Sequence, residues 1–294
     1  MIREPAATHL RLLLVSLFWG GIFVSGKLAV SEVGPFTVAE VRFLLSALTL
    51  LILLAHRRPE ELRAFHTRHV PLFLGLGLVG IAAYNALFYF GLKLTSASQA
   101  ALMMPTNLPV ATALMASLIL KEPFDWRKAL GIGLSLAGVV LVVGQGGVPR
   151  LRPSDLVLLT GVLCFAVFSV YGKVATQVFS PLAANAFLSV FGAAFLLPLA
   201  FTESPWASLE HAPLGFWLNI GYTVVFGTVL SYVWWYEGIQ RIGASRAGVF
   251  TYLVPVWAML LSFMILGERV SLPQLAGGLM AASGIWVVNG GRGG

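Results

Sequence analysis

The segment FWGGIFVSGK at Phe18–Lys27 returns 146 residues later as CFAVFSVYGK at Cys164–Lys173, and this repetition decides the fold. The same spacing continues through both halves of the chain. It pairs Pro35 with Pro181, Pro109 with Pro255, Glu122 with Glu268, Gly131 with Gly277, and Gly138 with Gly284. A constant spacing between matching residues indicates that the chain consists of two copies of one structural unit.

The composition places both copies in a membrane. Of the 294 residues, 58% are hydrophobic and only 11% are charged, and the mean hydropathy is +0.86. A soluble domain carries about 25% charged residues, so this chain has too little polar surface to face water on all sides. The net charge of +7 comes from basic residues in the gaps between apolar runs, and we therefore expect no nucleic-acid partner.

Ten apolar runs are long enough to cross a bilayer, because a helix of about 20 residues spans the hydrocarbon core. They cover residues 10–30, 36–55, 70–92, 97–120, 127–145, 154–174, 181–201, 213–237, 244–266 and 272–290. The predicted fold is an all-α integral membrane protein. Its ten transmembrane helices form one five-helix repeat at 10–145 and a second, inverted five-helix repeat at 154–290.

The odd number of helices in each repeat turns the second repeat upside down relative to the first. Lysines and arginines favour cytoplasmic N- and C-termini, with a clear bias in the first half and a weak bias in the second. In secondary transporters, two inverted repeats expose one site at the middle of the membrane to either side in turn. The pattern therefore predicts transport by alternating access.

The opening segment also has the spacing of a glycine-rich phosphate loop, at Gly21, Gly26 and Lys27. Such a loop needs Ser or Thr after the lysine to hold magnesium, and Leu28 occupies that position. Cys164 is the single cysteine, and every histidine falls in a loop or tail, so we expect no metal site and no cofactor. No nucleophile and base stand in register for hydrolysis, and we expect no enzyme activity.

Four stretches carry a resemblance to a known family. They read LFWGGIFVSGKLA at 17–29, FTVAEVRFLLSALTLLIL at 36–53, NLPVATALMASLILKEPFDWRKALGIGLSLAGVVLVV at 107–143 and YLVPVWAMLLSFMILGERVSLPQLAGGLMAASGIWVV at 252–288. They resemble the two repeats of the EamA type of the drug/metabolite transporter superfamily. The overall likeness is strongest to the YddG group of bacterial aromatic amino-acid exporters.

This resemblance implies a multi-pass transporter of a bacterial inner membrane, with a small-molecule substrate and the lipid bilayer as its partners. The superfamily exports amino acids, other metabolites and drugs, and some relatives carry nucleotide sugars or phosphorylated sugars. The two halves differ at charged positions. Ala186 replaces Glu40, and Leu188 stands where Arg42 would be, so these charges act once rather than symmetrically.

Arg42 lies about 9 Å inside its helix from the outer end. A charge inside the membrane is costly and marks a functional site by default. Three roles stay open for Arg42: binding a substrate carboxylate, forming a gating ion pair, or stabilising the fold. Glu40 points to a different helix face, and we expect it at the outer surface or as the carrier of a coupled proton.

Prolines interrupt two of the expected spans. The fourth span carries MMPTNLP at Met103–Pro109, where Pro105 and Pro109 free backbone carbonyls and Asn107 lies between them. The ninth span carries TYLVP, which ends at Pro255. Broken helices with polar groups near the middle of the membrane are where transporters bind substrates. We therefore predict hinges at all three prolines, although kinks that only aid packing are also common.

The predicted substrate-binding residues are aromatic or polar side chains near the centre or ends of the spans. Besides Arg42 and Asn107 they are Tyr84, Asn85, Phe88, Gln99, Met103, Tyr171, Tyr232, Trp235 and Tyr252. Aromatic faces would stack on a flat apolar solute, and the amides would meet its polar ends. The alternative for the aromatic residues is a belt at the membrane interface.

These features predict export of small, largely apolar zwitterions, namely amino acids including aromatic ones. Efflux of drugs or other hydrophobic metabolites is an alternative, as is exchange of nucleotide sugars or phosphorylated metabolites. A membrane-bound transferase or scaffold is a further alternative. The oligomeric state and the energy coupling stay open. The glycine pairs of the fifth and tenth spans predict close contact between helices.

Overall fold

The computed structural model describes residues 3–119, 121, 126–144, 151–242 and 247–289. The expected span ends at positions 120, 145, 244 and 290 lie outside these residues, as does Glu122. Every regular element in the described part of the chain is helical, which confirms the all-α class.

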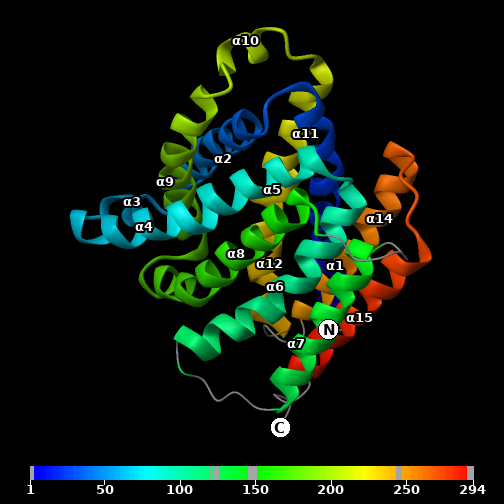
Figure 1. The fold of residues 1–294 in the computed structure, drawn as a ribbon. Helices are drawn as coiled ribbons and strands as arrows, with labels where there is room; N and C mark the ends of the chain where they lie inside the picture. The colour runs from blue at the N-terminus through cyan, green and yellow to red at the C-terminus, as the bar shows by residue number, and fades with distance from the viewer. Residues whose placement is uncertain (1–2, 120, 122–125, 145–150, 243–246, 290–294) are drawn as a thin grey trace.

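The helices follow the predicted spans in order. The first half consists of α1 (Arg3–Glu32), α2 (Pro35–Arg57), α3 (Pro59–Arg63), η1 (Thr67–His69), α4 (Val70–Leu76), η2 (Gly77–Ala83), α5 (Tyr84–Leu94), α6 (Ala97–Ile119) and α7 (Trp126–Gly144). The second half consists of α8 (Pro153–Val178), α9 (Pro181–Phe201), α10 (Pro205–Glu210), α11 (Leu214–Val224), η3 (Val225–Leu230), α12 (Ser231–Ile242), η4 (Val249–Tyr252), α14 (Leu253–Leu266) and α15 (Leu272–Asn289). Figure 1 shows them as one helical bundle.

Eight helices of the described chain are long and apolar enough to cross a membrane, and Ala129–Gly144 is a shorter apolar helix. The helix α15 corresponds to the tenth expected span. The architecture is therefore consistent with ten spans, and the count of ten stays a prediction. We call the end of the bundle where α1 ends and α2 begins the outer end, and the opposite end the inner end.

Proline defines where three of the long helices begin. The helices α2, α8 and α9 start at Pro35, Pro153 and Pro181. A proline in the first turn costs no hydrogen bond, because the amide at that position has no partner within the helix. In α9 the preceding Ser180 also accepts a hydrogen bond from the Ala183 amide at 3.3 Å.

The helices α2 and α9 run antiparallel and cap each other. Glu203, which follows α9, accepts hydrogen bonds from the amides of Phe36 at 3.3 Å and Thr37 at 2.8 Å. Glu61, which follows α2, accepts one from the Ser180 amide at 2.9 Å. The carboxylates satisfy amides that a helix start leaves free, and their charge suits the helix dipole. Each helix therefore begins beside the end of the other, as inverted repeats require.

The helices α7 and α15 pack with their backbones in contact. A Cβ atom added to Gly277 would lie 2.6 Å from the carbonyl oxygen of Gly138. A Cβ atom added to Gly284 would lie 2.5 Å from the carbonyl oxygen of Gly131. These distances confirm that the four glycines allow close approach of the two halves.

The third and eighth spans each contain a π-helical segment, which the sequence analysis missed. The segments η2 and η3 occupy equivalent places in the two halves, directly before α5 and α12. A π turn inserts an extra residue into the helix, redirects the side chains around it, and frequently marks a functional site. Predicted aromatic residues follow both segments: Tyr84 comes directly after η2, and Tyr232 comes two residues after the end of η3.

The outer end of the bundle is tied together across the halves. Glu268, which follows α14, accepts hydrogen bonds from the amides of Ala97 and Ser98, both at 2.9 Å, at the start of α6. Lys27 near the end of α1 donates to the carbonyls of Leu92 at 2.7 Å and Thr95 at 2.6 Å. The turn between α5 and α6 is therefore fixed on both sides, because Lys27 binds carbonyls at the end of α5 and Glu268 binds amides at the start of α6.

At the inner end, aromatic rings join α4, α8 and α9. Phe65 lies 4.3 Å from Phe187, and Phe73 lies 5.7 Å from Phe179, between ring centroids. Aromatic pairs at these separations stabilise the contact beyond the area that they bury. This side of the inner end is closed, in contrast to the side formed by α2 and α12.

Candidate functional site

Arg42 is the centre of a polar cluster formed by both halves. The side chain is 7% exposed. Its Nη1 donates to the hydroxyl of Tyr89 at 3.2 Å on α5, and its Nη2 donates to Thr228 Oγ1 at 3.4 Å in η3. The guanidinium carbon also lies 5.0 Å from the centroid of the Phe43 ring. Two neutral hydroxyls therefore hold the cation in place.

The charge of Arg42 has no counterion in the described part of the chain. Its Nε is buried there without a hydrogen-bond partner, and no ion pair includes this arginine. A buried charge that lacks an opposite charge is costly. The site is therefore electrostatically incomplete, and an anion would complete it.

Glu40 is not at the outer surface, which corrects one of the two expectations for it. Its side chain is 6% exposed, and Oε2 is buried without a hydrogen-bond partner among the described residues. Glu40 and Arg42 are two positions apart on α2, a separation that directs side chains to different faces of a helix. The two charges consequently do not neutralise each other.

Two tyrosines of α5 lie near the arginine, and Tyr232 of α12 lies near Tyr84. Tyr84 lies within electrostatic range of Arg42, Tyr89 and Tyr232. The ring of Tyr84 also packs 5.0 Å from that of Phe165 on α8. Predicted aromatic residues of α5 and α12, which are far apart in sequence, therefore meet at Tyr84, near the cation.

An indole on α1 continues this aromatic lining. The ring of Trp19 lies 6.5 Å from that of Tyr232 and 5.2 Å from that of Trp235, and its Nε1 donates to the carbonyl of Gly227 at 3.2 Å. Trp19 is not among the predicted substrate-binding residues. Here it connects α1 to η3 and to the predicted residues of α12.

The π-helical geometry of η3 presents a hydroxyl to Arg42. Thr228 Oγ1 donates to the carbonyl of Thr223 at 3.1 Å, and Ser231 Oγ donates to that of Phe226 at 2.5 Å. Both bonds reach back five residues, one more than in an α-helix. Sequence reasoning missed Thr228 and also Tyr89. Tyr89 follows the predicted Phe88 directly, whereas no residue pattern of η3 indicated Thr228.

Three predicted amides make hydrogen bonds within the bundle, away from the arginine. Asn85 donates to the carbonyl of Ile81 at 2.8 Å in its own helix. Gln99 Nε2 donates to Asp155 Oδ1 at 2.8 Å, which joins α6 to α8.

Asn107 is the third of these amides, and it links two helices of the first half. It donates to the Met103 carbonyl at 2.6 Å and accepts a hydrogen bond from Ser135 Oγ at 2.6 Å, which joins α6 to α7. Met103 itself is fully buried, and Phe88 packs edge-on against Phe23 at 5.3 Å between centroids. Substrate contact by these residues stays a prediction.

The other predicted residues lie away from the cluster or shape the backbone. Tyr171 on α8 is 45% exposed, and Tyr252 ends η4. The helix α6 continues through Pro105 and Pro109 without a break in its assignment. Pro255 is the third residue of α14, directly after the 3-10 segment η4, so the ninth span does change helix type beside its proline. Hinge motion at these positions stays a prediction.

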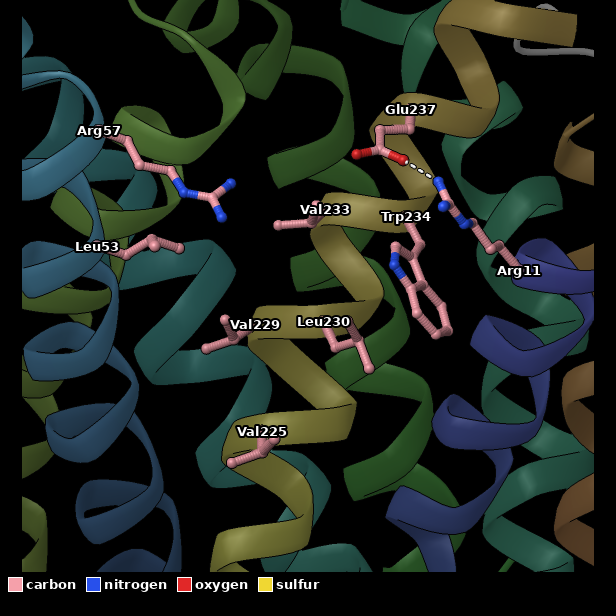
Figure 2. Close-up of a pocket in the computed structure, with 9 residues that line it drawn as sticks. All are labelled: Arg11, Leu53, Arg57, Val225, Val229, Leu230, Val233, Trp234 and Glu237. Atoms are coloured by element: carbon pink, nitrogen blue, oxygen red, sulfur yellow. Dashed lines mark hydrogen bonds and ion pairs between the residues drawn. The ribbon is translucent and has the colours of Figure 1, made fainter. Parts of the chain in front are cut away.

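A groove opens at the inner end between α2 and α12. It has a volume of about 410 Å³ and is lined by Arg11, Leu53, Arg57, Val225, Val229, Leu230, Val233, Trp234 and Glu237. We call it the entrance groove. The helix α2 packs against α11 and η3 but does not pack closely against α12, so the gap widens toward the inner end. Figure 2 shows Arg57 reaching into the groove from α2.

One face of α2 leads from this groove to the arginine cluster. Arg42, Ser46, Leu53 and Arg57 are spaced by four, seven and four residues, so they follow a single helix face. Ser46 lies between the two arginines, and its hydroxyl is buried without a partner in the described chain. The outer end is tied across the halves, and the entrance groove opens at the inner end.

Comparison with known proteins identifies the chain's relatives. The family model described as the EamA-like transporter family matches residues 7–144 and 152–290. A relative in Bacillus subtilis, named "Uncharacterized transporter YyaM", is 34% identical and aligns over 96% of this chain and 93% of its own length. A "Probable terminal-alkyne amino-acid exporter" of Streptantibioticus cattleyicolor is 23% identical over 95% of this chain and 92% of its own length.

A solved structure shares the fold. One crystal structure superposes with a TM-score of 0.60 at 18% identity and covers 96% of each chain. This likeness concerns the fold alone.

Proposed function

This chain belongs to the EamA-like transporter family, and from that premise we propose that it exports amino acids, aromatic ones included, by alternating access. The proposed export runs outward across a bacterial inner membrane in which both termini are cytoplasmic. The distribution of lysine and arginine supports this orientation. The protein would act on a small-molecule substrate by moving it rather than by transforming it.

The observation that carries the proposal is the incomplete charge of Arg42. The guanidinium is buried, two neutral hydroxyls hold it, and Nε is free to donate within the described residues. A substrate carboxylate would supply the missing anion, and a charged hydrogen bond of this kind contributes about 1.5–3 kcal/mol. Among the roles open for Arg42, carboxylate binding fits this geometry best.

The aromatic rings around the arginine fit the rest of such a substrate. Tyr84, Tyr232 and Trp19 provide flat faces on which an apolar or aromatic side chain would stack. The printed name of the Streptantibioticus cattleyicolor relative describes an amino-acid exporter, which supports the same substrate class here. An aromatic lining of this kind would suit aromatic amino acids, the substrates that the resemblance to the YddG group implies.

The two ends of the bundle suggest how access would alternate. Substrate would enter through the groove at the inner end, while Glu268 holds the start of α6 at the outer end. Release to the outside would require this cap to break and the groove between α2 and α12 to close. The π segments η2 and η3 and the proline sites are the places where these helices would bend.

Drug efflux is the runner-up, and Glu40 is the observation that favours it. A hydrophobic cation would need a carboxylate in the pathway, and Glu40 is buried with one oxygen unpartnered in the described structure. A phosphorylated or nucleotide-linked sugar would need several basic groups to face the site, whereas the polar cluster contains Arg42 alone.

Counterflow into proteoliposomes tests the proposal. Vesicles preloaded with unlabelled phenylalanine should accumulate labelled phenylalanine, and empty liposomes should not. We expect Arg42→Gln to lower this uptake by about 10- to 100-fold, because it removes a charged hydrogen bond, and Arg42→Lys to retain more of it. Equal protein amounts and equal thermal stability are the controls. A parallel series with a pH gradient shows whether protons are coupled.

Three results would contradict the proposal. Absence of counterflow with every amino acid tested would exclude the substrate class, and uptake of hydrophobic cations that Glu40→Gln abolishes would establish the runner-up. Full amino-acid transport by Arg42→Gln would show that the arginine stabilises the fold instead.

A further inference from the structure

We propose that the entrance groove is a second substrate site, which binds the head group of a zwitterionic amino acid before it reaches Arg42. This inference rests on the proposed function and deepens it, because it assigns the cytoplasmic recognition step to residues outside the arginine cluster. Its occupant is the transported amino acid itself, with a carboxylate, an ammonium group and an apolar side chain.

The charges at the mouth of the groove suit such a head group. Arg11 Nη1 lies 2.6 Å from Glu237 Oε2, so these two residues form an ion pair. Arg57, in contrast, forms no hydrogen bond or ion pair within the described ranges and extends into the groove (Figure 2). A carboxylate would pair with Arg57, and the ammonium group of the same molecule would find Glu237 on the facing helix.

The walls of the groove suit the rest of the molecule. Below the charged mouth, Leu53 of α2 faces Val229 and Val233, and Trp234 lines the α12 side (Figure 2). The volume of about 410 Å³ falls in the range of small-molecule sites, which is about 300–1,000 Å³. An apolar or aromatic substrate side chain would gain free energy by leaving water for the groove. A polar side chain would gain no such free energy from these apolar walls.

The groove is separate from the arginine cluster, and one face of α2 leads from one to the other. Arg57 and Arg42 are fifteen residues apart on α2, which corresponds to about 22 Å along the helix. A single amino acid cannot span this distance, so the two arginines must act one after the other. Ser46, with its unpartnered buried hydroxyl, lies between them on the same face.

Sided membrane vesicles test this inference with labelled phenylalanine as the probe. Inverted vesicles present the cytoplasmic face to the medium, and right-side-out vesicles present the outer face. We expect Arg57→Gln to raise the half-saturating phenylalanine concentration about 3- to 10-fold in inverted vesicles, since the lost contact is partly exposed to water. In right-side-out vesicles the change should stay within about 2-fold.

Two variants serve as controls. Arg63→Gln removes an equal charge from α3, where the arginine is exposed and lies outside the groove. It should leave the half-saturating phenylalanine concentration unchanged in both kinds of vesicle. Arg42→Gln should raise the value in both kinds of vesicle, because the central site serves both directions. Phenylpropionate, which lacks the ammonium group, should inhibit uptake more weakly than phenylalanine into inverted vesicles of the wild type.

Several outcomes would overturn the inference. If wild-type vesicles transport phenylalanine and Arg57→Gln does not change the half-saturating concentration in inverted vesicles, the groove is not a substrate site. The proposed function would then still stand. If the wild type transports no amino acid, both proposals fall. If the effect of Arg57→Gln disappears in vesicles without anionic phospholipid, the groove holds a lipid head group instead of the substrate.

Discussion

Arg42 on α2 donates from Nη2 to Thr228 Oγ1 on η3 across 3.4 Å, which joins residues 186 positions apart at the centre of the bundle. This contact places the single buried cation of the polar cluster against a hydroxyl of the opposite half. The hydroxyl is oriented by the π turn, in which it also donates to the Thr223 carbonyl at 3.1 Å. The geometry of η3 therefore helps to fix the position of the guanidinium.

We expect Thr228→Val to weaken phenylalanine transport, because it removes a neutral hydrogen-bond partner of Arg42. Such a bond contributes about 0.5–1.5 kcal/mol, so the half-saturating concentration should rise about 2- to 12-fold. Thr228→Ser keeps the hydroxyl and is the matched control in the same counterflow assay. If Thr228→Val transports phenylalanine as well as the wild type does, the hydroxyl does not contribute to binding.

We expect Glu268→Ala to favour opening of the outer end. The substitution removes the carboxylate that accepts the Ala97 and Ser98 amides, and loss of a helix cap costs about 0.5–2 kcal/mol. The measurement is the rate at which an impermeant maleimide labels Met103→Cys from outside, with Cys164 replaced by serine. Met103 is fully buried in the present state, so the rate should rise several-fold. The exposed Glu210→Ala is the control, and an unchanged rate would mean that the cap does not hold the outer end.

We expect the stability that Glu61 confers to depend on pH. Burial raises the pKa of Glu61, but the hydrogen bonds from Ser180, and the hydrogen bond and charge of Arg58, outweigh it and hold the pKa below its usual value. A carboxyl with a lower pKa in the folded state stabilises the fold above its unfolded pKa of about 4.3 and loses this effect as the pH falls through the folded value. The thermal midpoint of Glu61→Gln should therefore lie below that of the wild type at neutral pH.

This difference between the midpoints should shrink as the pH falls below about 4. The neighbouring Glu60→Gln, whose carboxylate is exposed, is the control measured in the same detergent. A difference that is independent of pH would mean that Glu61 acts by packing rather than by charge.

We expect Gly277→Ala to destabilise the contact between α7 and α15. The new Cβ would lie 2.6 Å from the Gly138 carbonyl oxygen, so the helices would have to separate, at a cost of about 1–3 kcal/mol. Gly133→Ala is the matched control, since its Cβ would meet nothing within 4 Å. A lower thermal midpoint for Gly277→Ala alone would support the contact, and equal midpoints for the two variants would contradict it.

The overall fold could be predicted because duplication leaves a spacing that survives in the sequence. Apolar length defined the spans, and the glycines seven residues apart defined the contact between α7 and α15. The π segments could not be predicted in the same way. A π turn depends on how a helix packs against its neighbours, and η2 and η3 contain no residue pattern that separates them from an ordinary transmembrane helix.

The candidate site could be predicted only in part, for a related reason. The sequence indicated that Arg42, Tyr84 and Tyr232 were unusual groups in apolar surroundings, and the structure brings them within electrostatic range of one another. It did not indicate which amides would bond to their own helix, as Asn85 does with Ile81. Partners of a polar side chain depend on rotamer and helix rotation, which residue spacing does not determine.

The exchange of caps between α2 and α9 has a consequence for the ancestry of the chain. Glu61 and Glu203 each follow one helix and complete the start of the other, so neither half is self-sufficient. A five-helix ancestor would have found a cap for the start of its second helix only by pairing with a second copy inserted the opposite way round. After fusion of such a dual-topology dimer, the same residue no longer had to fit both orientations. One half could then keep Arg42 where the other half has Leu188.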